Sequence, residues 1–197
     1  MNLLHIDSSI LGSASTSRAL TAQIVERLKG RRPGLKVSHR DLAASPLPHY
    51  SAESLAAQDP AAAARDEATL QEFLAADVIV IGAPLYNFSL PSQLKAWIDR
   101  IAIKGRTFRY GPRGPEGLAG GKQVIVAIAR GGVYEPGAGT EFAESYLRHL
   151  FGFLGINDLT FVRAEGLNVS SEQRERSVAS ARGHIDALEP AAAALAA

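Results

Sequence analysis

The sequence predicts a doubly wound α/β fold, in which helices cover both faces of one five-stranded parallel sheet. Short β-branched apolar runs, typified by VIVIGA and VIVAIA, suit strands that are buried on both faces, as they are in parallel sheets. Segments with helical spacing of apolar residues separate these runs, and this alternation is typical of βαβ units. Five strands favour the order 2-1-3-4-5.

The first part of the chain opens with an apolar run at residues 2–7, which predicts the first strand. Residues 17–29 have apolar side chains four positions apart. Gly30 and Pro33 follow them, so the pattern predicts a helix that stops there. A weaker β-like run at 35–40 predicts a second strand.

Residues 41–75 are rich in alanine, interrupted by proline, and too long for one plain crossover helix. They are predicted to form a loop followed by one or two helices. The run at 77–83 predicts the third strand, and the helix predicted over 91–103 has Pro91 in its first turn. Trp97 lies on the apolar stripe of that helix, and we interpret it as a core residue.

The second half of the chain continues the alternation. A glycine- and proline-rich stretch at 107–121 predicts a loop or a short hairpin. The elements predicted after it are a strand at 123–129, a helix at 140–154, a strand at 158–164 and a helix at 171–188. In the helix at 140–154 the spacing gives one apolar face, made of Phe142, Tyr146 and Leu150, which is expected to be either core or a dimer surface. The alanine-rich residues 191–197 are expected to fray.

Composition is typical of a single globular domain, which we expect to span residues 1–197. Hydrophobic residues make up 46% and charged residues 21% of the chain, which argues against disorder. The 21 Lys and Arg nearly balance the 20 Asp and Glu, so the net charge is +1. Because nucleic-acid binding needs many basic contacts to phosphates, we expect no nucleic-acid partner.

The sequence also argues against several locations and chemistries. No apolar run approaches the roughly twenty residues that span a bilayer, and the first ten residues lack the basic start of a signal peptide. We therefore expect a cytoplasmic protein without a membrane partner. With no cysteine, disulfides, thiol nucleophiles and cysteine-ligated metals are excluded. No metal is predicted, because four of the five histidines show no metal-ligand spacing with carboxylates: His39, His49, His149 and His184. His5, within the first strand, is interpreted as a structural residue.

A serine-rich loop follows the first strand, at the edge of the sheet where open α/β folds bind ligands. The sequence DSSILGSASTSR places several hydroxyls before or at a helix N-terminus, namely those of Ser9, Ser15, Thr16 and Ser17. Free amides and the positive end of the helix dipole favour an anion there, so the loop predicts phosphate binding. The alternative is that Ser15 or Thr16 only caps the helix. Neither a Walker A loop nor a G-x-G-x-x-G fingerprint is present.

The loop after the third strand presents two aromatic rings and an amide at the same edge. Its residues are Pro84, Leu85, Tyr86, Asn87 and Phe88. Aromatic side chains beside backbone donors and acceptors suit a flat ligand. The alternative is a turn whose aromatic rings pack under the following helix.

The loop after the fourth strand combines Ala129 and Arg130 with Gly131 and Gly132, and Tyr134 follows closely. The glycine pair is expected to allow positive φ and a close approach of backbone to ligand. Arg130 or the nearby amides would stabilise negative charge, and Tyr134 would close over a ring. A flexible turn is the alternative. Together the three loops describe a mononucleotide with a large planar ring.

On these residues the sequence resembles the FMN-dependent NADH-azoreductases, which are flavodoxin-like NAD(P)H quinone reductases. Essentially the whole chain shares the resemblance. The motifs that carry it are Ser9 with STSR at 15–18, PLYNF at 84–88 with the downstream PSQLKAWID, ARGG at 129–132 and AEG at 164–166. The resemblance implies a flavodoxin-like fold in which Ser9, Ser15 and Ser17 hold the FMN phosphate. It also implies that residues 84–88 and 130–132 hold the isoalloxazine ring, mainly through backbone groups.

The same resemblance implies a function. An FMN-dependent oxidoreductase would take hydride from NADH or NADPH and reduce quinones and azo compounds in a ping-pong cycle, as a homodimer with the flavin site at its interface. Chemistry of this kind resides in the flavin, so no side chain is assigned as acid or base. Ala129 departs from the serine that the family often has, which removes one side-chain hydrogen bond to the flavin.

Two other functions remain open. A flavodoxin-type electron carrier is usually acidic, whereas this chain has a net charge of +1 and a pI near 8.1. A non-catalytic module that binds a phosphorylated ligand would also use the serine loop. For the choice between NADH and NADPH, the sequence offers Arg106, Arg109 and Arg113 as candidates to meet a 2′-phosphate.

Overall fold

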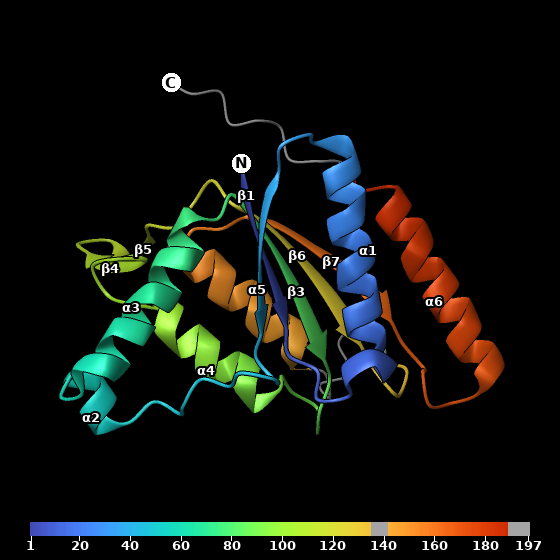
Figure 1. The fold of residues 1–197 in the computed structure, drawn as a ribbon, viewed down its shortest axis with the longest axis horizontal. Helices are drawn as coiled ribbons and strands as arrows, with labels where there is room; N and C mark the ends of the chain where they lie inside the picture. Colours follow the sequence, from blue (N-terminus) through green and yellow to red (C-terminus); the bar gives the residue numbers. More distant parts are fainter. Residues whose placement is uncertain (135–141, 189–197) are drawn as a thin grey trace.

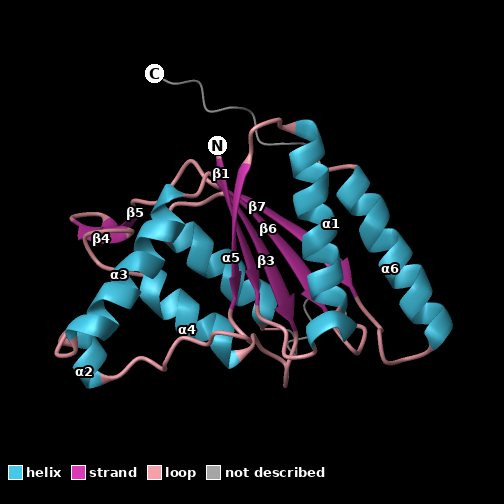
Figure 2. Ribbon diagram, in the orientation of Figure 1, coloured by secondary structure: helices cyan, strands magenta, loops and turns pink. Residues whose placement is uncertain are grey.

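The computed structural model describes residues 1–134 and 142–188, and it contains a five-stranded parallel sheet with helices on both faces (Figures 1 and 2). The strand order is β2-β1-β3-β6-β7, which is 2-1-3-4-5 when only the strands of this sheet are counted. The predicted fold class and strand order are therefore confirmed. In the described part of the chain, no helix is long and apolar enough to cross a membrane.

The strands of the sheet begin and end within one residue of their predicted bounds. They are β1 (Asn2–Asp7), β2 (Lys36–Asp41), β3 (Val78–Pro84), β6 (Gln123–Ala129) and β7 (Asp158–Ala164). All neighbouring pairs are parallel, with β2 at one edge and β7 at the other. As a result, the loops that follow these strands all leave the sheet at one edge, its carboxyl edge.

The helices divide into two layers (Figure 1). On one face lie α1 (Thr16–Arg31) and α6 (Ser171–Asp186). On the other face lie α3 (Pro60–Ala75), α4 (Ser92–Ile101) and α5 (Ala143–Phe153). The remaining elements are short: a 3-10 turn η1 (Gly12–Ala14), helix α2 (Ala52–Leu55) and the hairpin of β4 (Phe108–Gly111) and β5 (Gly114–Gly117). The loop-plus-helices prediction for 41–75 and the hairpin prediction for 107–121 are both confirmed.

The core consists of two apolar clusters, one on each side of the sheet. Because side chains alternate along a strand, Leu3 packs toward α1 and α6, while Leu4 packs toward α3, α4 and α5. Trp97 is fully buried in the second cluster, where its ring meets the edge of Phe73 at a centroid distance of 6.0 Å. The interpretation of Trp97 as a core residue is therefore confirmed.

The apolar face predicted for helix α5 is divided between the core and the surface. The helix buries Ala143, Leu147, Leu150 and Phe151, and Tyr146 is partly buried against the same cluster. Phe142 lies just before the helix and is 54% exposed. Leu150 is therefore a core residue, whereas Phe142 remains available for a dimer surface, the other alternative for this face. Residues 140 and 141, with which the predicted helix began, and residues 191–197 lie outside the described part of the chain.

Candidate functional site

A cavity of about 210 Å³ opens at the carboxyl edge of the sheet, near the N-terminus of α1. Four loops contribute to its walls, those that follow β1, β3, β6 and β7. The lining residues are Ser9, Leu11, Ala14, Ser15, Thr16, Pro84, Leu85, Tyr86, Ala129, Arg130, Gly131, Leu167, Asn168 and Arg174. The three loops singled out in the sequence therefore meet at one cavity. Five other residues predicted for the site do not line the cavity: Ser17 in the first turn of α1, and Asn87, Phe88, Gly132 and Tyr134 in these loops.

The first loop presents hydrogen-bond donors at the N-terminus of α1. Ser15 caps the helix, and its Oγ accepts from the amide of Arg18 at 3.3 Å. The amides of Thr16 and Ser17 donate to no acceptor within the described residues. Ser17 is fully buried, with its hydroxyl 3.0 Å from that of Ser15, so it hydrogen-bonds to the capping residue from the protein interior. Two unpaired amides beside two hydroxyls form a neutral anion site.

Arg18 fixes the shape of this loop. Its Nε and Nη2 atoms donate to the carbonyl of Ser9 at 3.1 and 2.7 Å. Nη1 and Nη2 also donate to the carboxylate of Asp41, each at 2.7 Å. These bonds hold the pKa of Asp41 well below its usual range, so the pair stays charged at neutral pH. The loop is thereby tied to the end of β2.

Tyr86 connects the second loop to the first. Its hydroxyl lies 3.2 Å from the Oγ of Ser9 and accepts from the amide of Ile10, also at 3.2 Å. On the other side, the amide of Leu85 donates to the carbonyl of Ala129 at 2.8 Å. The loops after β1, β3 and β6 therefore form one bonded unit, which preorganises the cavity wall.

The residues after Tyr86 form a tight turn with an unusual backbone. Tyr86 and Ser89 exchange amide-to-carbonyl hydrogen bonds of 3.0 Å in both directions. Between them, Asn87 has a φ of 47° and Phe88 a φ of 68°, the pattern of a type I′ turn. Asn tolerates this conformation, but a bulky residue such as Phe adopts it at a cost. The turn leaves the Phe88 ring 55% exposed beside the cavity, so it is not packed under the helix.

The third loop uses its carbonyl groups for structure and leaves two amides unused. The carbonyls of Gly131 and Gly132 accept from the amides of Asn168 and Gly166, at 2.9 and 2.8 Å. The amides of Gly131 and Gly132 donate to nothing in the described parts of the chain. Two donors are thus free at the end of β6.

Close packing, and not backbone conformation, favours glycine at one position of the pair. Neither Gly131 nor Gly132 has a positive φ, so that expectation is wrong. At Gly131 a Cβ would come within 2.6 Å of Nδ2 of Asn168, whereas at Gly132 it would make only ordinary contacts. A side chain at position 131 would therefore force Asn168 of the neighbouring loop to move.

Arg130 is held by carboxylates. It is 4% exposed, and its guanidinium pairs with Glu165 at 2.6 Å and Glu144 at 3.3 Å. Burial alone would raise the pKa of Glu144, but Arg163 and Arg148 outweigh it and lower the pKa. The predicted role of Arg130 as a positive charge for a ligand is therefore weakened, because two carboxylates already face it. Tyr134 stacks near the Arg130 guanidinium, at 5.8 Å from its ring centroid.

The sequence analysis used residues 164–166 for the resemblance but assigned no site residue beyond them, in the loop after β7 or at the start of α6. Leu167, Asn168 and Arg174 line the cavity. Arg174 donates through Nε to the carbonyl of Leu167 at 2.9 Å, with Nη2 3.4 Å from Oδ1 of Asn168, and it brings a positive charge to the wall. The sequence contained the information needed to find these residues. All strands of a parallel sheet end at the same edge, so the residues after the strand predicted at 158–164 had to lie beside the three loops already singled out.

The arginines suggested for a 2′-phosphate lie elsewhere. The β4–β5 hairpin packs against Gly155, just before β7 begins, so it sits at the opposite edge of the sheet. Arg109 pairs there with Glu116 at 2.7 Å, and Arg113 lies in the same hairpin. Arg106 pairs with Glu67 at 3.0 Å. The suggestion is therefore wrong for this site.

A second cavity, of about 350 Å³, lies between α3, α4 and the α2 region. Its charged groups are already paired, Arg100 with Asp66 at 2.5 Å and Arg106 with Glu67. It offers no cluster of unpaired donors comparable to the carboxyl edge, so we take the smaller cavity as the candidate site.

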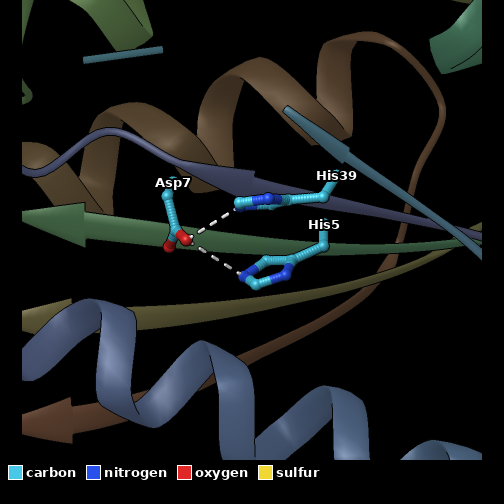
Figure 3. A group of neighbouring side chains, drawn as sticks. All are labelled: His5, Asp7 and His39. Carbon is cyan, nitrogen blue, oxygen red and sulfur yellow. Dashed lines mark hydrogen bonds and ion pairs between the residues drawn. The ribbon is translucent and has the colours of Figure 1, made fainter. Parts of the chain in front are cut away.

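Two histidines and an aspartate, which their spacing in the sequence did not relate, are brought together by β1 and β2 (Figure 3). Nε2 of His39 lies 3.1 Å from Oδ2 of Asp7, and Nε2 of His5 lies 3.4 Å from the same oxygen. Burial alone would raise the pKa of Asp7, but the His5 imidazole and hydrogen bonds from Thr21 and His39 lower it. The expectation that His39 forms no constellation with a carboxylate is therefore wrong, and His5, interpreted as a structural residue, is its neighbour in the cluster.

Comparisons with known proteins agree with this architecture. The family model described as "flavodoxin-like fold" matches residues 1–188. The chain is 56% identical over 192 residues to FMN-dependent NADH:quinone oxidoreductase 1 of Xanthomonas euvesicatoria pv. vesicatoria, covering 98% of both chains.

Solved structures match as well. An azoreductase from Bacillus anthracis superposes with a TM-score of 0.86 at 29% identity, covering 95% of this chain and 97% of its own. An FMN-dependent NADH-azoreductase from B. anthracis, solved in complex with FMN, gives a TM-score of 0.84 at 26% identity over 95% and 99% of the two chains. The resemblance seen in the sequence motifs is confirmed, and the chain belongs to the flavodoxin-like family that includes these oxidoreductases.

Proposed function

We propose that this chain is an FMN-dependent oxidoreductase that uses NADH to reduce quinones and azo compounds. The observation that carries the proposal is the pairing of two donor sets at one edge of the sheet. A neutral anion site lies at the N-terminus of α1, and unused amides lie at the end of β6. The names of the relatives, FMN-dependent NADH:quinone oxidoreductases and azoreductases, support the same reading.

The first donor set suits the phosphate of FMN. The amides of Thr16 and Ser17 and the hydroxyl of Ser15 would donate to phosphate oxygens, helped by the α1 dipole. The Ser9 hydroxyl, fixed by Tyr86, would add a further donor. Because Arg18 is saturated by Ser9 and Asp41, it would shape the cradle without contacting the anion.

The second donor set suits the edge of an isoalloxazine ring. Gly131 lines the cavity, and its amide and that of Gly132 would donate to ring atoms that gain negative charge on reduction. Pro84, Leu85 and Tyr86 would form the wall against which the ring lies. When bound, FMN supplies the redox chemistry, accepting hydride from a nicotinamide and passing it to a quinone or azo acceptor. The protein's part is to bind and orient, so no side chain is assigned as acid or base.

The rim of the site is unusually apolar. Six large hydrophobic side chains more than half exposed lie in the carboxyl-edge loops or directly before α5: Ile10, Leu11, Phe88, Val133, Phe142 and Val169. An exposed apolar rim around a ligand site favours a covering partner. We propose that a second copy of the chain covers it, giving a homodimer with the flavin site at the interface. Reliance on NADH is the basis for proposing the cytoplasm as its location.

The proposal is tested by the visible spectrum of the purified chain after addition of FMN and desalting, followed by anaerobic NADH and then a quinone. We expect a retained yellow chromophore that NADH bleaches and the quinone restores. Bleaching by NADH without turnover of quinone would favour an electron carrier. Failure to retain FMN would leave a binding module for another phosphorylated ligand and would refute the proposal.

A further inference from the structure

We propose that His5, Asp7 and His39 form a binding site for one divalent transition-metal ion of the zinc class. The site lies on the face of the sheet that α1 covers, and its residues are absent from the cavity at the carboxyl edge. It is therefore a second site, independent of the proposed cofactor site. Two imidazole nitrogens and one carboxylate oxygen are a donor set that suits Zn²⁺ and its neighbours.

The backbone presents both imidazoles to one carboxylate oxygen. His5 and His39 are direct partners in the parallel β1–β2 register, and their rings lie 4.5 Å apart, tilted by 34°. Asp7 is two residues beyond His5, so it shares the same face of β1. Figure 3 shows the two rings side by side, both directed at Asp7.

The separations of the donor atoms suit a tetrahedral ion. Bonds of about 2.0–2.2 Å place neighbouring ligand atoms about 3.3–3.6 Å apart in a tetrahedron. Oδ2 of Asp7 lies 3.4 Å from Nε2 of His5 and 3.1 Å from Nε2 of His39. All three atoms lie within 4.8 Å of one another, so small side-chain rotations would bring them around one ion.

The buried nitrogen of His5 is an independent indication of a ligand. His5 is 9% exposed, and its Nε2 forms no hydrogen bond of normal geometry within the described residues. Its nearest polar neighbour is Oδ2 of Asp7, and 3.4 Å is too long for a good hydrogen bond, so a cation bound between the two atoms would satisfy both directly. The nitrogen also points into the cluster, toward Asp7.

A supporting hydrogen bond orients the carboxylate. The hydroxyl of Thr21 donates to Oδ1 of Asp7 at 2.9 Å, which leaves Oδ2 directed at the two imidazoles. Metal-ligating carboxylates are commonly held in this way by a hydrogen bond to the other oxygen. Thr21 is fully buried in α1, so the orientation is rigid.

Solvent access and the neighbouring charges both affect how tightly the proposed site would bind a metal ion. The side chain of His39 is 49% exposed, so an ion can enter from solvent, and water would complete the coordination. The guanidinium of Arg18 lies 3.7 Å from Oδ2 of Asp7 and opposes a second positive charge. Because Asp41 is paired with Arg18 through two hydrogen bonds, part of that opposition is neutralised.

The test is a calorimetric titration of the untagged full-length chain with zinc chloride, after removal of metals by chelation. His39→Ala removes the most exposed ligand, so the variant should fold. The matched control is His184→Ala, an exposed histidine in the last turn of α6, outside the cluster. Binding of Co²⁺, followed by its visible absorption, reports the coordination geometry separately.

We expect the wild type and His184→Ala to bind one equivalent of zinc with similar affinity, and His39→Ala to bind at least about tenfold more weakly. Zinc should also raise the melting temperature of the first two proteins but not of His39→Ala. Equal binding by His39→Ala, or loss in His184→Ala instead, would show an adventitious surface ion and overturn the proposal. Absence of one-equivalent binding to the wild type would overturn it too.

Discussion

Replacing Ser15 with alanine tests the proposed phosphate cradle at the residue that caps α1. The Ser15 hydroxyl accepts from the amide of Arg18, and when the Ser17 hydroxyl donates across their 3.0 Å contact, the proton of Ser15 is available for a ligand. A hydrogen bond to a charged group contributes about 1.5–3 kcal/mol. Ser15→Ala should therefore weaken FMN binding by about 10- to 150-fold, since each 1.4 kcal/mol is tenfold. Quenching of flavin fluorescence on titration with the metal-free protein measures this affinity.

The loss of a helix cap must be separated from the loss of a ligand contact. Capping serines contribute about 1 kcal/mol to stability, so Ser15→Ala should also lower the melting temperature of the protein without FMN. Ser51→Ala is the matched control, because Ser51 caps α2 by accepting from Ser54 at 3.2 Å, away from the site. We expect this control to bind FMN like the wild type. An FMN affinity of Ser15→Ala within twofold of the wild type would refute the cradle.

Three further predictions follow from the geometry of the loops. Gly131→Ala should weaken FMN binding because its Cβ would meet Nδ2 of Asn168 at 2.6 Å; adding Asn168→Ala should restore most of the affinity, and a titration that shows no recovery would contradict this cause. Phe88→Gly should raise the free energy of unfolding by about 0.5–1 kcal/mol by relieving the positive φ, and a lower urea midpoint would argue against strain there. Glu144→Gln should be destabilising near neutral pH, because folding lowers the pKa of Glu144 and the ionised carboxylate therefore stabilises the folded state. This stabilisation is lost as the pH falls through the folded-state pKa, so the difference in urea midpoint from the wild type should shrink in acid. The exposed control Glu175→Gln should show no such trend.

The sheet was predictable because its signal is local. Apolar runs such as residues 78–81 and 124–128 lie wholly within one strand, and burial on both faces leaves no competing pattern. The serine loop was predictable for the same reason, since the cap, the amides and the dipole belong to one helix end. The apolar residues around helix α5 were harder to assign because they serve two surfaces: Leu147, Leu150 and Phe151 are buried, whereas Phe142 is exposed.

Contacts between segments were beyond the reach of the sequence. The need for glycine at 131 comes from Asn168, and that requirement exists only once two loops have been brought side by side. The cluster around Asp7 depends on the register of β1 against β2, which pairs His5 with His39. A shift of that register by one residue would place the two imidazoles on opposite faces of the sheet. Such sites therefore appear only with coordinates.

The bonds of Arg18 make the first loop part of the same cooperative unit as the edge strand. Strand β2 has a sheet partner on one side only, which is β1, and it ends at Asp41. Because Arg18 holds both Asp41 and the carbonyl of Ser9, release of β2 would remove one of the two sets of bonds that fix the loop, the other being the bonds to Tyr86. In hydrogen exchange, the protection of the β2 amides should therefore rise when the loop is held more firmly. A bound phosphate group would slow the opening of a strand that it does not touch.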